Sequence, residues 1–222
     1  MSKDRPVRIL VVCTGNIHRS PLAAALLRTW ADWYLGDLAA DVEIASAGLF
    51  AVVGAPMPVG TQTIARALKA DGSLHRARAL SDEAIENADL ILTAEVSHRD
   101  AIVARAPRAL RRTFTVREAG RAAAQLLAGE ALAVPQTRDE ITARAQQLAL
   151  FRSAGDDDVI DPHGEPEEAA LQMTADLVPA LAVVAQALLG MPGHAADAYI
   201  TATADSDMLR ALIAAAQHEA AQ

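Results

Sequence analysis

The feature that most constrains the fold is an apolar run that ends in a cysteine and a short loop. Apart from Arg8, residues 7–12 are all Val, Ile or Leu, and Cys13–Asn16 follows directly. A run of this kind is typical of a central strand in a parallel sheet, which is buried on both faces. Beyond the loop we expect Ser20 to cap a helix and Pro21 to take its first position.

The rest of the chain alternates between short apolar runs and segments with helical spacing. Further strands are expected at 42–45, 88–93 and 113–116. We therefore predict an α/β fold, a doubly wound four-stranded parallel sheet with helices on both faces. Aromatic residues make up only 3% of the chain, so Ala, Leu, Val and Ile must build the core. In such sheets ligands bind at the carboxyl ends of the strands, where Cys13 is placed.

The sequence predicts one domain over residues 1–190, followed by a C-terminal tail over 191–222. Within the domain, 121–155 is rich in Ala, Gln and Arg and is predicted to be a peripheral helical insertion. The tail contains a weak helical pattern over 206–220, which either docks, pairs with a partner or stays loose.

Charge and cysteine content limit the partners and the compartment. The net charge is −8 and the sequence has no basic stripe, so we expect no nucleic-acid partner. One cysteine excludes an internal disulfide framework and a paired-cysteine metal site. The N-terminal apolar run is too short for a signal peptide or a membrane span. We expect a cytoplasmic protein that uses no membrane, metal or other cofactor.

The loop after the first strand has the composition of an anion cradle. Between a strand and a helix, backbone N–H groups can turn inward, and Gly15 and Asn16 tolerate the positive φ that this needs. The planar fork of Arg19 can hold two phosphate oxygens, and the positive field favours the reactive thiolate of Cys13. The expected phosphate-binding residues are Thr14, Gly15, Asn16, Ile17, His18 and Arg19.

Thiolate attack on phosphorus also needs an acid that protonates the departing oxygen. The candidate is Asp161, which Pro162 holds on a loop far along the chain. The same carboxylate would act as base when water hydrolyses the phosphoenzyme. The acidic residues 156–158 are predicted to form a solvated loop.

At these residues the chain resembles the low-molecular-weight protein tyrosine phosphatases. The loop of that family reads C-x-G-N-x-C-R-S, and residues 13–20 match it except at His18. The likeness covers about 1–120 and 156–189, and 121–155 resembles actinobacterial members. Its further motifs are Ser46–Gly48, Gly54–Pro58, His75 with Arg78, Asp89–Leu92, Arg117-Glu118 and Asp161-Pro162.

The resemblance implies a role for each matching residue. Cys13 would be the nucleophile, Arg19 the phosphate clamp and Asp161 the general acid. A hydrogen-bond network would hold the loop in shape, and the hydroxyl of Ser20 would donate to the thiolate. The network residues are Asn16, Ser46 and His75. The implied partner is a phosphorylated protein, such as a tyrosine-autophosphorylated kinase of polysaccharide export, or a small phosphomonoester.

The departures from the family pattern concern protection and substrate choice. His18 replaces a second cysteine that traps the oxidised nucleophile in many members, so no such disulfide is expected. Val52 and His163 stand where aromatic residues often form the wall of the substrate site, and Phe50 is a candidate replacement. At Ile17, arginine phosphatases of the family carry Thr, so an aliphatic residue favours the tyrosine type.

The prediction is thus a phosphomonoester hydrolase, with protein phosphotyrosine as the favoured substrate and a cysteinyl-phosphate intermediate. One alternative is an arsenate reductase on the same scaffold, in which a low-molecular-weight thiol is the second reductant. Another is a non-catalytic phosphate-binding module. A nucleotide-binding P-loop protein is disfavoured because no Gly-Lys-Ser/Thr follows Gly15.

Overall fold

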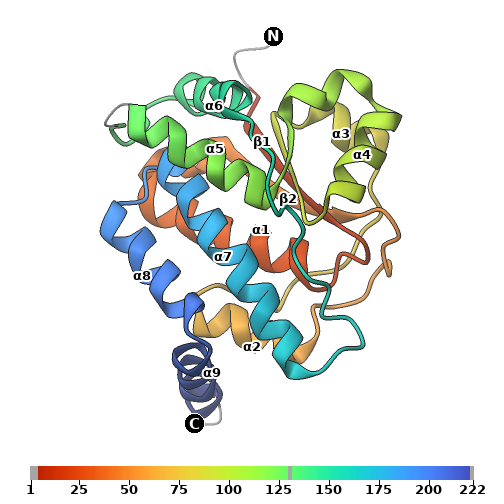
Figure 1. The fold of residues 1–222 in the computed structure, drawn as a ribbon, viewed down its shortest axis with the longest axis vertical. Coiled ribbons are helices and arrows are strands. Elements are labelled where there is room, and N and C mark those ends of the chain that lie inside the picture. Colours follow the sequence, from red (N-terminus) through yellow and green to blue (C-terminus); the bar gives the residue numbers. More distant parts are fainter. Residues whose placement is uncertain (1–4, 130–131, 221–222) are drawn as a thin grey trace.

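A computed structural model describes residues 5–129 and 132–220 and contains a four-stranded parallel sheet with helices on both faces (Figure 1). The predicted doubly wound fold is therefore confirmed. The strands are β1 (Val7–Cys13), β2 (Val42–Gly48), β3 (Leu90–Thr93) and β4 (Thr113–Thr115), in the order β2-β1-β3-β4. The chain leaves β1 toward β2 and returns to β3 on the other side. The carboxyl end of β1 is therefore a topological switch point, where a crevice opens.

Helices fill the connections between the strands and continue after the last one. The α-helices are α1 (Arg19–Tyr34), α2 (Val59–Ala67), α3 (Asp82–Asn87), α4 (Val96–Arg105), α5 (Val116–Gly129), α6 (Arg138–Gln147), α7 (Glu167–Leu189), α8 (Gly193–Ala204) and α9 (Ser206–Ala220). The 3₁₀ segments are η1 (Gly36–Asp41), η2 (Pro107–Arg112) and η3 (Leu148–Phe151).

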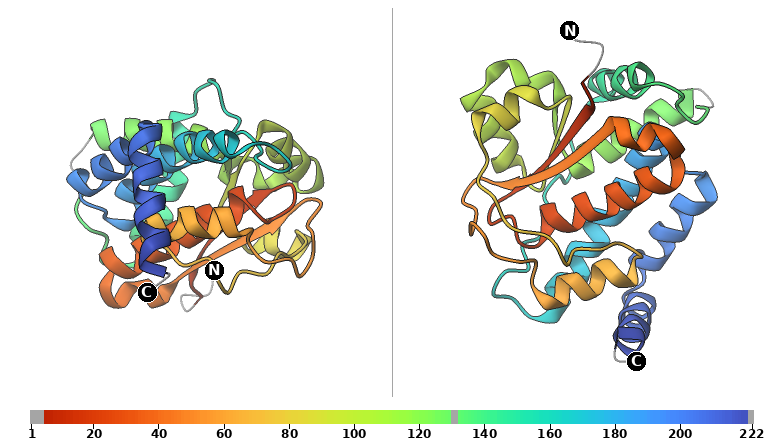
Figure 2. Two further views of the ribbon diagram at one scale, coloured as in Figure 1. Left: turned by 90° about the horizontal axis from the view of Figure 1, so that it is seen from below. Right: turned by 180° about the vertical axis from the view of Figure 1, so that it is seen from behind.

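Alternate residues of β1 point to two separate apolar cores. Ile9 and Val11 belong to the larger core, which includes buried residues of α1, α5 and α7. Leu10 and Val12 face the smaller one, built with Ile85 of α3 and other residues of α3, α4 and η2. The views in Figure 2 show α1 and α7 on one side of the sheet and α3 on the other. Burial on both faces explains why β1 is almost wholly aliphatic.

The beginning of α1 differs from the prediction. The helix starts at Arg19 with His18 at the N-cap, and the hydroxyl of Ser20 caps no backbone N–H. It is turned instead toward Cys13 and Asn16. Pro21 remains within the first turn, where a missing N–H costs no helical hydrogen bond.

The described part of residues 121–155 contains the end of α5, α6 and η3, and the end of α5 is less peripheral than expected. The main part of α5 packs on α7, and a Cβ built on Gly120 would lie 2.9 Å from Cα of Ala180. The buried positions of α5 include Ala122, Ala123 and Leu126, which belong to the main core. The close approach of these two helices explains the small residues on their facing sides.

The C-terminal tail docks on the domain. In α8, the ring of Tyr199 lies edge-on to Trp30 of α1, with 4.8 Å between ring centroids. The hydroxyl of Tyr199 donates to the carbonyl of Leu68 at 3.2 Å, and Leu209 of α9 is fully buried. Of the docking, pairing and loose alternatives for this segment, the structure has the first.

The helix α7 is long and apolar enough to cross a bilayer by length and composition. Most of its apolar stretch is buried inside the protein, and Leu181 and Leu188 are wholly covered. Its neighbours are α1, α5 and α8, so α7 is the central core helix of this face.

Candidate active site

The loop after β1 turns three successive backbone carbonyls toward one neighbouring segment. The carbonyls of Cys13, Thr14 and Gly15 accept hydrogen bonds of 3.0, 2.9 and 3.1 Å from backbone N–H groups of the 49–52 segment. In a trans peptide, the N–H of the next residue points the opposite way. The N–H groups of residues 14–16 therefore point away from this segment, into the curl of the loop, as an anion nest requires.

Asn16 is the centre of the network that holds this curl. It has a left-handed φ of 55°, and its carbonyl accepts from Nε2 of His75 at 2.7 Å. Its Nδ2 donates to the hydroxyls of Ser20 (2.9 Å) and Ser46 (3.0 Å). Its Oδ1 accepts from the backbone N–H of Arg78 at 2.9 Å. The residues predicted to support the loop thus meet around one buried amide.

The sulfur of Cys13 lies 2.9 Å from the hydroxyl oxygen of Ser20. Because that oxygen already accepts from Asn16, the proton of Ser20 can be donated either to the sulfur at 2.9 Å or to the carbonyl of Ala47 at 3.4 Å, and the sulfur is the nearer acceptor. A hydroxyl at this distance can donate a charge-assisted hydrogen bond to the sulfur during the reaction. Gly48 closes the loop from the side, since a Cβ there would lie 2.5 Å from the carbonyl oxygen of Thr14.

The guanidinium of Arg19 is 1% exposed and is held on two sides. Its NH1 group donates to a carboxylate oxygen of Glu95 and to the carbonyl of Val159 at 3.1 Å. Its NH2 group donates to the hydroxyl of Thr14 at 3.1 Å and to Oδ2 of Asp161 at 2.6 Å. The buried Nε–H has no acceptor within the described part of the chain. An unpaired buried donor costs about 1–3 kcal/mol, so this N–H is available for an anion.

Two residues of the site escaped the sequence analysis, Glu95 and His98. Glu95 follows β3 and pairs with Arg19, and Nε2 of His98 lies 3.0 Å from the hydroxyl of Thr14. Burial on its own would raise the pKa of Glu95, but the hydrogen bond from Arg19 and the charge of His98 hold it below its usual value. The sequence did contain a signal for Glu95, since it follows a predicted strand of the parallel sheet. Because β3 pairs in parallel with β1, the carboxyl ends of the two strands lie at the same edge of the sheet.

The acidic residues 156–158 lie in a loop, and Asp156 and Asp158 are exposed as predicted, but Asp157 is not solvated. Asp157 is 9% exposed and forms an ion pair with Arg121 of α5. Oδ1 of Asp158 accepts from the first backbone N–H of α4 at 2.8 Å. These contacts fasten the segment to two helices, and a fastened segment can present Asp161 at a defined place.

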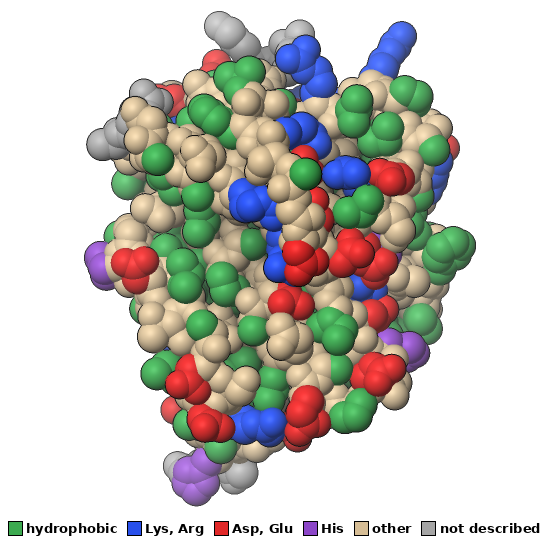
Figure 3. All heavy atoms as spheres, viewed as in Figure 1, with side chains coloured by type: hydrophobic (Ala, Val, Ile, Leu, Met, Phe, Trp, Pro, Cys, Tyr) green, Lys and Arg blue, Asp and Glu red, His purple; other side chains and the backbone are tan. Residues whose placement is uncertain are grey.

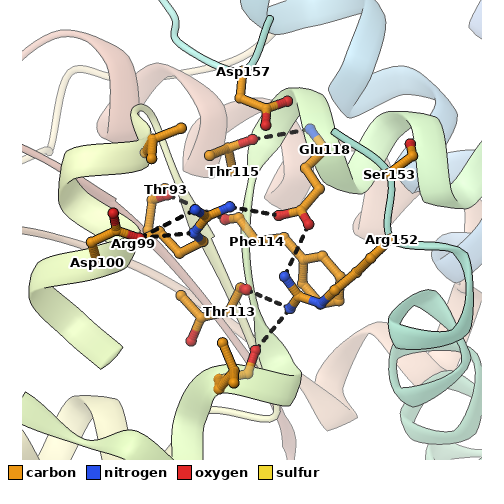
Figure 4. A network of polar contacts seen from close by, with 12 residues as sticks. Thr93, Arg99, Asp100, Thr113, Phe114, Thr115, Glu118, Arg152, Ser153 and Asp157 are labelled. Carbon is orange, nitrogen blue, oxygen red and sulfur yellow. Dashed lines mark hydrogen bonds and ion pairs between the residues drawn. The ribbon is translucent and has the colours of Figure 1, made fainter. Parts of the chain in front are cut away.

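A second network anchors the chain just before this segment (Figure 4). NH1 of Arg152 donates to the buried carboxylate of Glu118 at 2.9 Å, and NH2 donates to the carbonyl of Thr113 at 2.6 Å. The guanidinium also lies 3.8 Å from the ring centroid of Phe114. Arg99 approaches the other oxygen of Glu118 at 3.6 Å. The motif residue Glu118 therefore ties α4, α5, β4 and the start of the acidic segment together.

The predicted catalytic, phosphate-binding and wall residues line one cavity of about 240 Å³, with the exception of Asn16, which is fully buried behind the loop. Its lining comprises Cys13, Thr14, Gly15, Ile17, His18, Arg19, Phe50, Val52, Asp161 and His163. The proposed wall residues Phe50 and Val52 are 79% and 52% exposed, so they form an open rim. The rings of His18 and His163 lie 6.0 Å apart.

The burial of three histidines, of which His98 is the most covered, should make the stability of the fold depend on pH. Burial lowers the pKa values of His18, His75 and His98, with partial opposition from Asp161, from the Asn16 carbonyl and from Glu95 respectively. Below pH 6.5 the unfolded chain then binds more protons than the folded one. We expect the free energy of unfolding to fall as pH decreases from 7 to 5, measured by urea denaturation.

His98→Gln tests the source of this pH dependence. It should reduce the loss of stability between pH 7 and pH 5, whereas His218→Gln, at an exposed position of α9, should not. Equal stability of the unmodified protein at the two pH values would contradict the prediction.

Comparison with known proteins agrees with this geometry. A model of the low-molecular-weight phosphotyrosine protein phosphatase family matches residues 8–154, which include the whole cradle. The chain therefore belongs to this family, and it is a phosphatase. The matched region ends before Asp161, so the position of this residue comes from the structure.

Individual relatives include two kinds of phosphatase. The chain is 40% identical to a protein-arginine-phosphatase of Geobacillus stearothermophilus over 51% of this chain and 71% of the relative. It is 38% identical to the low-molecular-weight protein-tyrosine-phosphatase Wzb of Escherichia coli K12 over 45% and 62%. A crystal structure of a YwlE mutant from Bacillus subtilis superposes with a TM-score of 0.58 at 25% identity, covering 81% and 97% of the two chains.

Proposed function

We propose that this phosphatase hydrolyses phosphotyrosine in cytoplasmic proteins through a phosphocysteine at Cys13. One observation carries the proposal. The sulfur lies at the base of a curl of inward N–H groups, and the buried Nε–H of Arg19 has no acceptor among the described residues. This combination suits a tetrahedral dianion with several oxygens.

The same contacts support a sequence of steps. The phosphate oxygens accept hydrogen bonds from the N–H groups of the loop and from Nε and NH2 of Arg19. The NH2 group gives up its hydrogen bond to Asp161 when it binds the phosphate. The thiolate of Cys13 forms the S–P bond while the bond to the tyrosine oxygen breaks, and protonated Asp161 gives that oxygen its proton. Asp161 then takes a proton from the water that attacks phosphorus, and the S–P bond breaks to release phosphate and the thiolate.

The phosphotyrosine assignment rests on the side chains around the cavity. Phe50 and Val52 offer apolar surface on one side, and His18 and His163 offer two rings on another. Ile17 adds an aliphatic surface next to the phosphate site. A phenyl ring can pack against this lining, and its phosphate then reaches Cys13.

Phosphoarginine is the second candidate substrate. It is favoured by the names of two relatives, since a protein-arginine-phosphatase of Bacillus subtilis is also 33% identical to this chain over 93% of its length. Its guanidinium would pair with Asp161, the only carboxylate among the residues that line the described cavity. The partner class for either substrate is a phosphorylated protein, and a tyrosine-autophosphorylated kinase is the proposed example.

Kinetics with matched peptides separate the candidates. We expect kcat/KM for a phosphotyrosine peptide to exceed that for the same peptide with phosphoarginine, and Ile17→Thr to narrow the difference. A higher value for phosphoarginine in the unmodified protein would overturn the phosphotyrosine assignment. Thiol-dependent arsenate reduction without hydrolysis of para-nitrophenyl phosphate would instead favour the arsenate reductase.

A further inference from the structure

A second cavity lies next to the active site, between α2, the beginning of α7 and α9. Its volume is about 280 Å³, and three elements supply its apolar surface. The apolar lining includes Pro58, Ile64, Pro162, Leu171 and Ile213. In Figure 1 these helix ends gather at the lower end of the molecule, and the views of Figure 2 agree. Nothing in the catalytic steps above uses this cavity.

The linings of the two cavities have one residue in common. His18 lines both of them, and its Nδ1 lies 2.7 Å from the hydroxyl of Thr61 on α2. Thr61 is 2% exposed, so this contact holds the imidazole in place as a ridge. The loop of the general acid continues the ridge, because Asp161 lines the first cavity and Pro162 the second. The second cavity is therefore within reach of a chain bound over the active site.

The far wall belongs to the C-terminal helix, outside the family match at residues 8–154. Ile213 and Gln217 of α9 line the cavity. The helix is held by the fully buried Leu209 and by ion pairs of Arg210 with Glu167 and Glu168, at 3.4 and 3.3 Å. The tail thus completes a cavity that residues 1–190 leave open on this side.

The charge around the opening is negative. Glu165 lines the cavity, is exposed, and forms no ion pair among the described residues. Figure 3 shows acidic side chains gathered along the loop before α7 and the start of that helix. An aliphatic side chain can be buried on the apolar floor while a basic neighbour pairs with Glu165.

We propose that this cavity is a specificity subsite that binds an aliphatic side chain of the substrate protein, next to a basic residue. The proposal rests on the proposed function. An extended chain advances about 3.3–3.6 Å per residue, so a site across one histidine is reached about two to four residues from the phosphorylated one. The subsite would give this phosphatase a sequence preference that the phosphate cradle alone does not supply.

Peptide kinetics test the subsite without any variant. Phosphotyrosine peptides carry a single Leu-Lys pair at successive positions within four residues of the phosphotyrosine, and the reference peptide carries Ser-Ser. At the best position kcat/KM should rise about 10-fold or more over the reference, as expected for burial of a leucine. Equal kcat/KM for all peptides would overturn the proposal. Loss of para-nitrophenyl phosphate hydrolysis in the same preparation would instead reject the proposed function.

Two tryptophan variants locate the effect. Ile213→Trp fills the cavity and should remove the preference for the Leu-Lys peptide, while kcat/KM for para-nitrophenyl phosphate stays unchanged. Ala215→Trp, at an exposed position of the same helix, should retain the preference. A preference that survives Ile213→Trp, or disappears equally in both variants, would contradict binding in this cavity. Glu165→Gln should reduce the part of the gain in kcat/KM that comes from the lysine and leave the part from the leucine unchanged.

Discussion

Arg19→Lys is expected to lower kcat/KM for para-nitrophenyl phosphate by about 10³-fold or more. Lysine keeps the charge but loses the planar fork, and the buried Nε–H that points to no protein acceptor within the described chain disappears. Glu95 and Asp161 would also lose the donors that now hold them beside the loop. Steady-state kinetics at saturating and low substrate would show the loss mainly in kcat, because the clamp acts on the transition state.

The control for this change is Arg28→Lys. Arg28 lies on the same helix, and its guanidinium donates to the carbonyl of Ile44 at 3.3 Å, away from the cavity. This variant should retain the activity of the unmodified protein. Thermal unfolding of both variants separates loss of catalysis from loss of fold. A folded Arg19→Lys protein with activity within a few-fold of normal would show that a point charge suffices, and the clamp would have to be abandoned.

Asp161→Asn is expected to lower kcat for phenyl phosphate by about 10²–10⁴-fold, because asparagine cannot protonate the departing oxygen. The loss should be much smaller for the formation of phosphoenzyme from para-nitrophenyl phosphate, whose leaving group departs readily as an anion. Rapid-mixing kinetics should then show a burst of para-nitrophenol followed by slow turnover, since hydrolysis of phosphocysteine also needs the carboxylate as base.

Asp156→Asn is the matched control on the same segment. Its carboxylate is 82% exposed and pairs only with Arg117 among the described residues, at 2.9 Å. This variant should leave kcat unchanged for both phenyl phosphate and para-nitrophenyl phosphate. If Asp161→Asn reduced phenyl phosphate and para-nitrophenyl phosphate equally and without a burst, the role of Asp161 would be positional, through its contact with Arg19.

Local sequence determined the parts of this protein that depend on neighbouring residues. The aliphatic run of β1, the loop from Cys13 and the helix behind it are consecutive, so periodicity and turn chemistry predict them together. Even here the N-cap of the helix was predicted at the wrong residue. The hydroxyl of Ser20 contacts Asn16 and Cys13 and does not cap a backbone N–H of the helix. A side chain with several possible partners cannot be assigned from propensity alone.

Residues that reach the site from distant parts of the chain were harder to predict. Asp161 was found because a proline follows it and a family motif contains it, whereas Glu95 has neither signal. Asp157 lies in a segment with the composition of a solvated loop, and only the arginine that α5 places opposite it explains the burial of this one carboxylate. Composition records charge but contains no information about which opposite charge lies nearby in space.

By itself, then, the sequence determined an α/β sheet with the loop of Cys13 and Arg19 at the end of its first strand. Tertiary structure alone decided that Glu95 and Asp161 hold the two sides of Arg19, and that α9 closes a cavity beside His18. The physical reason is the distance along the chain over which each kind of interaction acts. Strand, turn and helix preferences act between residues a few positions apart, whereas these contacts join segments that meet only after the sheet and its two cores have formed.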